Sequence, residues 1–256
     1  MQRRDFTRWL LSGAGTGLAA AAPHMTHAAV APDPQELLRA TDRVRGGDLP
    51  GVQWTLRITA HDPDLGADTR EMRVRAAGED SLAETTLPAR AAGGRLLQRG
   101  RNMWYGRPDL SKPISISNRQ KLMGPASNGD IASTNYVGDY DATLLREERV
   151  DDEPAWVLGL TARSGFVTYD RIEYWVSQQR QVPLRAAFLT VSGRIFKTAE
   201  IETRNTLVVD GRRQPFVSRM TIRDAIQPDI VSVLEYRDVQ QVRVARHELS
   251  VEALTR

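Results

Sequence analysis

The chain contains no cysteine and few histidines. His24 and His27 fall in an N-terminal segment that looks like a leader, so the body of the chain keeps only His61 and His247. Disulfides, thiol nucleophiles and cysteine-ligated metals are therefore excluded, and two distant histidines do not make a ligand-spaced cluster. His61 precedes two aspartates, but the alternating acids and closing glutamate of a calcium loop do not follow. The sequence predicts no metal and no cofactor.

The signatures of a nucleophile and of a phosphate site are also missing. Ser164 and Ser192 each precede a glycine, but neither stands in a G-x-S-x-G elbow. Gly93-Gly94 lacks the Gly-Lys that a phosphate-binding loop needs. Carboxylates at 147–148 and 151–153 flank a predicted turn, where such residues are common. We therefore predict that the protein is not an enzyme, and a hydrolase using a carboxylate pair is the minor alternative.

Positive charge is concentrated at the N-terminus. The formal net charge is +3, and it falls to about +1 when Arg3, Arg4, Arg8 and Asp5 are removed with the leader. Nucleic-acid binding requires a concentrated basic face, so no nucleic-acid partner is expected.

The first residues are typical of an export signal. Residues 2–8 read Gln-Arg-Arg-Asp-Phe-Thr-Arg, and with the weakly apolar run 9–22 they resemble a twin-arginine signal. The run is too short and too rich in glycine to be a permanent span. Cleavage after Ala28 predicts a signal over 1–28 and a single periplasmic domain over 29–256. An ordinary secretory signal or an uncleaved anchor is the alternative.

Strand patterns dominate the body of the chain. Helical spacing over 34–44 predicts one short opening helix. About a dozen segments then alternate apolar and polar residues, with 167–176 and 215–222 each expected as one strand. Helix-length segments are nearly absent between them, which favours an antiparallel, mainly-β fold. The long connection 112–141, with a helix expected over 118–123, is typical of a lid or binding loop.

Several strands carry apolar residues on both faces. Leu184, Ala186 and Phe188 alternate with Ala187 and Leu189. A sheet that is apolar on both faces needs two covers. The helices and the long loop could provide one cover, and an apolar ligand or a partner protein the other. An ordinary core is the simpler interpretation of any single residue.

The middle of the chain carries a diffuse motif. It comprises Asn-Met-Trp-Tyr at 102–105, Ile-Ser-Ile-Ser at 114–117, Gln-Lys-Leu-Met-Gly at 120–124, and then Gly129-Asp130 and Tyr136. These residues, with the order of elements over nearly all of the mature chain, resemble the LolA-like outer-membrane lipoprotein-sorting protein family. Two departures from the family pattern are a longer loop after the Met-Gly pair and the lack of a phenylalanine after the aspartate.

The resemblance implies an incomplete barrel. One curved antiparallel sheet would form a half-barrel around an N-terminal helix and a helix/loop lid, leaving an apolar cavity for acyl chains. Such a periplasmic carrier would move the acyl chains of a lipoprotein or lipid toward the outer membrane, hiding methylenes worth about 0.8 kcal/mol each. The alternative is an envelope protein-binding or sensing module, or an accessory subunit of a resistance-nodulation-division exporter. An inner-membrane transporter would then be a partner.

The resemblance also indicates which residues would bind lipid. A one-residue error in register would exchange the inner and outer sets. The candidates are Trp54, Leu56, Ile58, Met72, Val74, Trp104, Trp156 and Leu158 on strands, with Leu122 and Met123 in the lid.

Overall fold

The computed structural model describes residues 32–132 and 135–255. The expected export signal and its cleavage site lie outside the described residues. The described body begins with the predicted helix, α1 (Pro34–Val44), and no helix in it is long and apolar enough to cross a membrane. The side chain of Asp33 caps α1 by accepting a hydrogen bond from the Gln35 N–H at 2.8 Å.

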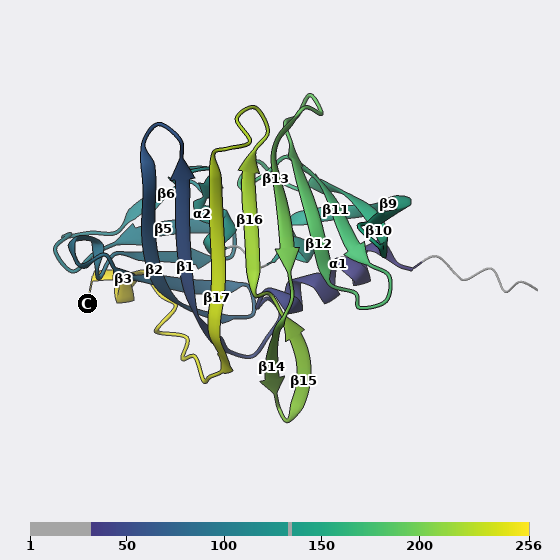
Figure 1. Cartoon of the computed structure of the whole chain (residues 1–256). Helices are drawn as coiled ribbons and strands as arrows, with labels where there is room; N and C mark the ends of the chain where they lie inside the picture. The colour runs from purple at the N-terminus through teal and green to yellow at the C-terminus, as the bar shows by residue number, and fades with distance from the viewer. Residues whose placement is uncertain (1–31, 133–134, 256) are drawn as a thin grey trace, which may run out of the picture. The chain divides into compact units, whose positions relative to one another are not determined.

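Thirteen strands form one antiparallel sheet. Its spatial order is β6-β5-β4-β3-β2-β1-β17-β16-β13-β12-β11-β10-β9. The edge strands β6 and β9 do not pair with each other, so the sheet is open, which confirms the predicted half-barrel (Figure 1). The strands are β1 (Val52–Asp62), β2 (Gly66–Ala77), β3 (Asp80–Leu87), β4 (Arg95–Arg99), β5 (Asn102–Gly106), β6 (Ile114–Ile116), β9 (Tyr140–Val150), β10 (Glu153–Ala162), β11 (Arg171–Ser177), β12 (Pro183–Leu189), β13 (Ile195–Glu202), β16 (Arg219–Asp224) and β17 (Val231–Gln241).

Two small hairpins stand outside this sheet. One is formed by β14 (Asn205–Val209) and β15 (Arg212–Phe216), and it separates β13 from its neighbour β16 along the chain. The other is formed by β7 (Lys121–Met123) and β8 (Ala126–Ser127), and it belongs to the long connection between β6 and β9. Two short helices, α2 (Asn128–Ala132) and α3 (Tyr136–Asp139), complete that connection.

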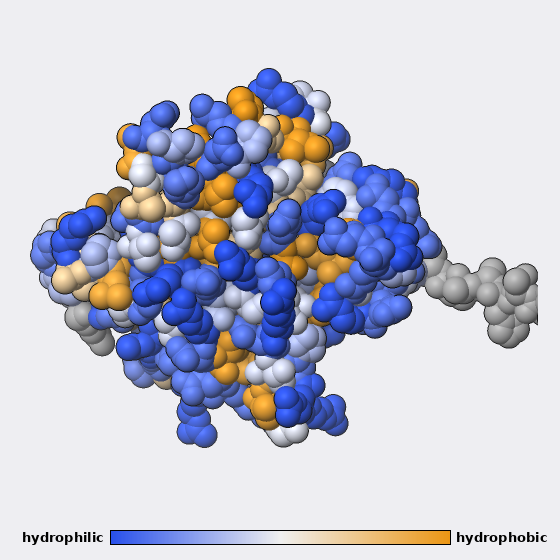
Figure 2. Space-filling model, in the orientation of Figure 1, coloured by the Kyte–Doolittle hydropathy of each residue, from blue (hydrophilic) through white to orange (hydrophobic). Residues whose placement is uncertain are grey.

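Helix α1 and the long connection cover one face of the sheet. In Figure 1, α1 and α2 lie behind the central strands. Leu37 and Leu38 of α1 and Ile131 of α2 belong to the same buried cluster as the inward residues of β1 and β2. The outward face of the central strands is largely hydrophilic, with separate hydrophobic patches (Figure 2). We call the covered side the inner face.

The outer face has apolar covers near both ends of the sheet. Leu82 and Leu97 pack there against Leu249 and Leu254 of the C-terminal segment. At the other end, Val157, Trp175 and Ala187 form a separate cluster. The prediction of strands that are apolar on both faces is therefore confirmed for these outer strands.

Three local predictions were wrong. The segment 118–123, which was expected to be a helix, instead contains the hairpin strand β7. This strand pairs with β8 because Gly124 adopts the positive φ of 52° that the turn needs. The strand expected over 167–176 begins only at Arg171, since the carbonyls of Phe166 and Val167 accept hydrogen bonds from lid side chains. The strand expected over 215–222 is divided between β15 and β16, which belong to different sheets.

Candidate functional site

Two adjacent strands build an apolar patch on the inner face. Along β1, Trp54, Leu56 and Ile58 are fully buried and alternate with half-buried polar residues. Trp54 stands opposite Val74 and Leu56 opposite Met72 on β2. Because cross-strand neighbours lie about 5 Å apart, these five predicted residues form one continuous surface.

The patch extends to the other half of the sheet. Leu158 on β10 is fully buried in the same cluster, and Trp156 packs against that cluster while half-buried. Trp54 also meets aromatic rings from other elements, with the Phe216 ring centroid at 5.6 Å and that of Tyr236 at 6.4 Å. The inner face is thus mainly apolar from β2 to β10, with Ser232 and Lys197 as polar exceptions.

The described part of the connection between β6 and β9, residues 117–132 and 135–139, lies on this surface, and we call it the lid. Met123, Ala126 and Ile131 are buried in the inner cluster, and Leu122 packs against it. Two buried serines of the sheet hold lid carbonyls: Ser232 Oγ donates to Met123 O at 2.7 Å, and Ser81 Oγ donates to Ala132 O at 2.7 Å. Apolar burial and hydrogen bonds to the sheet therefore attach this part of the lid together.

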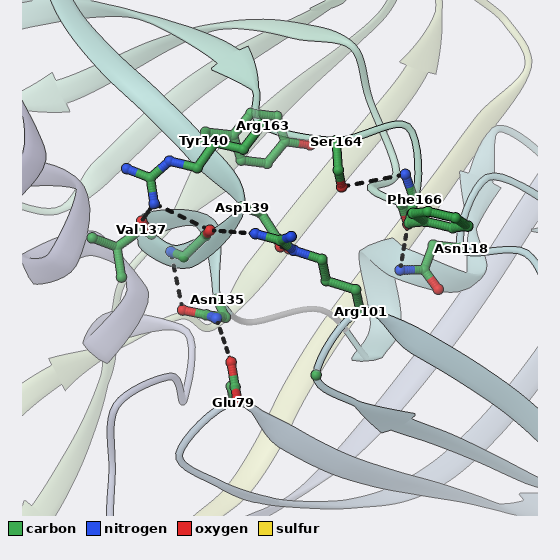
Figure 3. Close-up of polar contacts among 12 residues, drawn as sticks. Glu79, Arg101, Asn118, Asn135, Val137, Asp139, Tyr140, Arg163, Ser164 and Phe166 are labelled. Atoms are coloured by element: carbon green, nitrogen blue, oxygen red, sulfur yellow. Dashed lines mark hydrogen bonds and ion pairs between the residues drawn. The ribbon is translucent and has the colours of Figure 1, made fainter.

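The far end of the lid is attached by polar contacts near the surface (Figure 3). Arg101 Nε lies 3.3 Å from Asp139 Oδ1 of α3, and Asn135 Nδ2 donates to Glu79 Oε2 at 3.0 Å. Arg163 Nη1 donates to the carbonyl oxygen of Val137 at 3.2 Å. Pairs of this kind are worth little individually in water, so they position the lid without locking it.

A cavity of about 190 Å³ opens between the lid and strands β2–β6. Pockets that enclose a drug-sized ligand measure about 300–1,000 Å³, so this volume cannot house a long acyl chain while the lid is in place. With the lid in place, the rest of the inner face is covered. The cavity is lined by Met72, Leu96, Tyr105, Ile116 and Leu122, with Arg70, Thr85, Gln120, Lys121 and Asn128.

A buried polar cluster joins α1 to α3. The N–H of Val137 donates to Asp42 Oδ2 at 2.7 Å, and the Arg45 guanidinium lies 4.6 Å from the centre of the Tyr136 ring. Burial raises the pKa of Asp42 to about 7. Burial also raises the pKa of Tyr174, which lies beside this cluster. The cluster places a titratable carboxyl under the far end of the lid.

A second buried polar cluster joins the lid to the sheet. Lys197 Nζ on β13 donates to Ser127 Oγ at 2.8 Å and lies 3.9 Å from Asp130 Oδ2. Tyr169 OH donates to Asp130 Oδ1 at 2.7 Å, and the Tyr169 ring stacks on Phe188 with centroids 3.9 Å apart. Burial lowers the pKa of Lys197, and the carboxylate of Asp130 opposes this shift.

The solved structures contain a clear relative of this chain. A LolA superfamily protein from Nitrosomonas europaea shares 35% sequence identity, with a TM-score of 0.77, over 88% of this chain and 100% of its own. The chain belongs to the LolA superfamily.

Further comparisons agree on the LolA-like fold. A proposed outer membrane lipoprotein-sorting protein domain from Vibrio parahaemolyticus is 16% identical, with a TM-score of 0.73 over 87% of this chain and 98% of its own. A DUF1329 family protein from Desulfovibrio piger is 22% identical, with a TM-score of 0.71 over 87% and 100%. A family model described as "Uncharacterized protein" matches residues 77–256. No curated protein matches the chain.

One predicted residue of this LolA superfamily member lies apart from the others. Trp104 on β5 stands opposite Leu97 and packs on the outer face, against the C-terminal segment that ends in the 3-10 helix η2 (Val251–Thr255). The other nine candidates lie in the inner cluster or pack against it. Alternation alone does not distinguish the two faces, because each is apolar at β5.

Sequence reasoning missed the polar residues of the inner face. Lys197 lies on the same face of β13 as Ala199 and Ile201. A charged residue in an otherwise apolar alternation was therefore the signal that the sequence offered. Ser232 and Ser81 gave no such signal, because serine is common on either face of a strand.

The carboxylates considered for hydrolysis lie on the surface. Glu148 Oε2 accepts from Trp175 Nε1 at 2.7 Å, and Glu153 Oε2 pairs with Arg180 at 2.7 Å. Hydrogen bonds from Trp175 and then Arg146 lower the pKa of Glu148, so it does not have the raised pKa of a general acid. His61 is exposed, and among the described residues no group of three or more His, Cys, Asp or Glu could hold a metal ion.

Proposed function

We propose that this protein is a periplasmic carrier that binds acyl chains of a lipoprotein or lipid on the inner face and moves them toward the outer membrane. The observation that carries the proposal is the largely apolar inner face, covered by a lid whose own apolar side chains pack on it. Membership of the LolA superfamily supports it. Such a carrier needs no catalytic group, since burial of methylenes supplies the affinity without a directional clamp.

Release is as important as capture for a carrier. The lid side chains that fill the inner face, Met123 and Ile131, are themselves apolar and compete with the cargo for the same surface. Lid closure therefore replaces most of the apolar contact that is lost when cargo leaves. The expected affinity is moderate, which suits transfer between two membranes.

The test fixes the lid to the sheet. A Cβ built on Gly124 would lie 3.2 Å from the Ala60 Cβ, near the range of about 3.5–4.5 Å found in disulfides. It would also lie 2.8 Å from Ser232 Oγ, so that hydroxyl must shift in the reduced and the oxidised variant alike. The chain has no other cysteine, so the double variant Gly124→Cys/Ala60→Cys offers a single possible disulfide. We expect the reduced variant to bind a fluorescent fatty acid and the oxidised variant to lose at least about tenfold in affinity.

The reduced double variant is the matched control, because it carries the same substitutions and the same positive-φ strain at residue 124. Gly124→Cys alone should be insensitive to oxidant. Equal probe binding by the oxidised and reduced forms would show that cargo does not enter under the lid. Lipid extraction of the purified protein, followed by mass spectrometry, identifies the natural acyl chain.

A protein-binding or envelope-sensing module is a second candidate function. It is favoured by the outer apolar cluster of Val157, Trp175 and Ala187 near the edge strand β9, where Leu145 is exposed. An inner-membrane transporter, such as a resistance-nodulation-division exporter, would be the partner. Cross-linking in membranes distinguishes the two: a stable protein partner with no extracted lipid favours the module.

Export of residues 29–256 after cleavage of a twin-arginine signal is part of the proposal. Its support is the sequence of residues 2–8 and the small residues before the expected cleavage site at Ala28. N-terminal sequencing of protein from a periplasmic fraction should begin at Ala29. Replacing Arg3-Arg4 with Lys-Lys should retain the precursor in the cytoplasm if the twin-arginine route is used.

A further inference from the structure

A lysine side chain is enclosed on the inner face. Lys197 exposes only 5% of its surface, and its same-face neighbours along β13 are Ala199 and Ile201. Its cross-strand partners are Phe188 on β12 and Asp224 on β16. Lysine is almost never fully buried unless it is paired, so this position requires a physical reason.

The lid supplies the nearest polar atom to Lys197 Nζ and the carboxylate that pairs with it. Ser127 Oγ accepts from Nζ at 2.8 Å, and Asp130 Oδ2 lies 3.9 Å away. Tyr169 OH lies 3.3 Å from Nζ, and the rings of Tyr169 and Phe196 lie 5.1 and 5.8 Å from it.

The sheet itself supplies less charge to this lysine. Asp224 is its neighbour on β16, but Asp224 Oδ1 accepts from the N–H groups of Ile226 at 2.8 Å and Gln227 at 3.1 Å. No ion pair within 4 Å joins Asp224 to Lys197 in the described structure. The carboxylate that neutralises Lys197 at close range therefore comes from Asp130 of the lid.

Lid movement changes the surroundings of the ammonium group. If the lid swings away to admit an acyl chain, Ser127 and Asp130 leave with it, while Lys197 stays on β13. A cation left among apolar and aromatic groups retains only cation–π contacts and its neutral tyrosine partner. An unpaired buried charge costs several kcal/mol, so this site favours a new anion in place of Asp130.

We propose that Lys197 is the headgroup site of the inner face and selects acyl ligands with an anionic head, a carboxylate or a phosphate. The inference rests on the proposed carrier function. Asp130 occupies the same site when the lid is closed and is displaced by the ligand's anion. Lys197 is thus a specificity-determining residue, and Asp130 is its internal competitor.

The surface beside Lys197 suits the first part of an acyl chain. Ala199 and Ala186 are cross-strand neighbours, so two small apolar side chains adjoin the lysine on the inner face, and both are buried while the lid is closed. Ile222 stands opposite Ala199 on the other side. A chain that begins at the ammonium can therefore lie on a shallow apolar track that leads across the inner face.

The experiment compares two probes that differ only in the head. The mature protein is titrated with cis-parinaric acid and with its methyl ester, which has the same chain and no charge. We expect wild type to bind the acid at least about tenfold more tightly, since only the acid offers a charged acceptor to the ammonium group. The double variant Lys197→Met/Asp130→Asn removes both charges, so it should bind the acid and the ester with equal affinity. Asp130→Asn alone should bind the acid more tightly than wild type.

The matched control is Lys112→Met, which removes an exposed lysine just before β6. It should keep the wild-type preference for the acid. Displacement of the probe by palmitate would identify a carboxylate as the anionic head. Displacement by phosphatidic acid and not by palmitate would identify a phosphate. Inorganic phosphate alone should displace nothing.

The outcomes separate the two proposals. If wild type binds neither probe, the carrier function fails and this inference fails with it. If wild type binds both probes with equal affinity, the carrier function stands and the role of Lys197 is refuted. An acid preference that survives in the double variant, with its thermal unfolding intact, refutes it as well.

Discussion

The stability of this protein should fall as pH rises from about 4 to about 7 because of one buried carboxyl. Asp42 in α1 is 1% exposed, and burial raises its pKa from 3.8 to about 7. Between these two values the folded state holds a proton that the unfolded state has released. Folding is therefore favoured at the acidic end of the window, and this contribution is lost as pH rises through the folded pKa.

The magnitude follows from the width of the window. Each pKa unit corresponds to about 1.4 kcal/mol, so the full window amounts to about 4 kcal/mol. That is a large share of a typical free energy of unfolding of about 5–15 kcal/mol. The physical cause is the loss of hydration around an ionised carboxylate that accepts one backbone hydrogen bond, from Val137.

The assay compares wild type with Asp42→Asn by urea unfolding, followed by tryptophan fluorescence, from about pH 4 to about pH 8. The asparagine oxygen can still accept from the Val137 N–H, but the side chain no longer titrates. The free energy of unfolding of wild type minus that of the variant should fall by up to about 4 kcal/mol across this range. Subtracting the variant removes the contributions of other titrating groups, such as Glu148 and Glu153.

The control is Asp229→Asn, which removes an exposed carboxyl and should give a flat difference. A flat difference for Asp42→Asn, within about 0.5 kcal/mol, would refute the reasoning, because it would mean that water reaches the carboxyl in the folded state. A difference that rises with pH would mean that the Arg45 guanidinium outweighs the loss of hydration.

Two further predictions concern the lid and the two faces of the sheet. Ser232→Ala should destabilise the fold by about 1–3 kcal/mol, because it leaves Met123 O without its hydrogen bond. It should also speed the uptake of a fatty-acid probe, measured by stopped-flow fluorescence. Ser192→Ala, at an exposed serine, is the control, and unchanged uptake by Ser232→Ala would contradict the role of the lid. Leu56→Ala should lower the free energy of unfolding by about 3 kcal/mol and alter the affinity for the probe, since Leu56 lies on the inner face. Trp104→Ala should lower the free energy of unfolding by about 2 kcal/mol and leave the affinity unchanged, since Trp104 packs on the outer face. Equal effects of the two variants on affinity would contradict the assignment of faces.

Local sequence patterns were sufficient for the elements of this fold. The alternation of Trp54, Leu56 and Ile58 predicts a strand with one buried face, and α1 has its cap, its proline and its apolar spacing within its own residues. The absence of long helical patterns predicts an antiparallel sheet. These features depend on neighbours in the chain, so they can be read without knowing the fold.

Other features depend on contacts between distant segments. The hairpin of β7 forms because Met123 and Gly124 meet Ser232 of β17, which overrides a weak local helix signal. The side of the sheet that Trp104 faces depends on which cover reaches β5, and the C-terminal segment reaches it.

The sequence by itself determined that this chain makes a mainly antiparallel sheet with strands apolar on both faces. Only the tertiary structure decided that α1 and the lid close one face, because a strand's alternation defines two faces without saying what covers each. It also decided that Lys197 meets Asp130, since the lid folds back over β13 and brings together two charges far apart in the chain. The charge that could select a cargo is therefore visible in the sequence, whereas its partner is not.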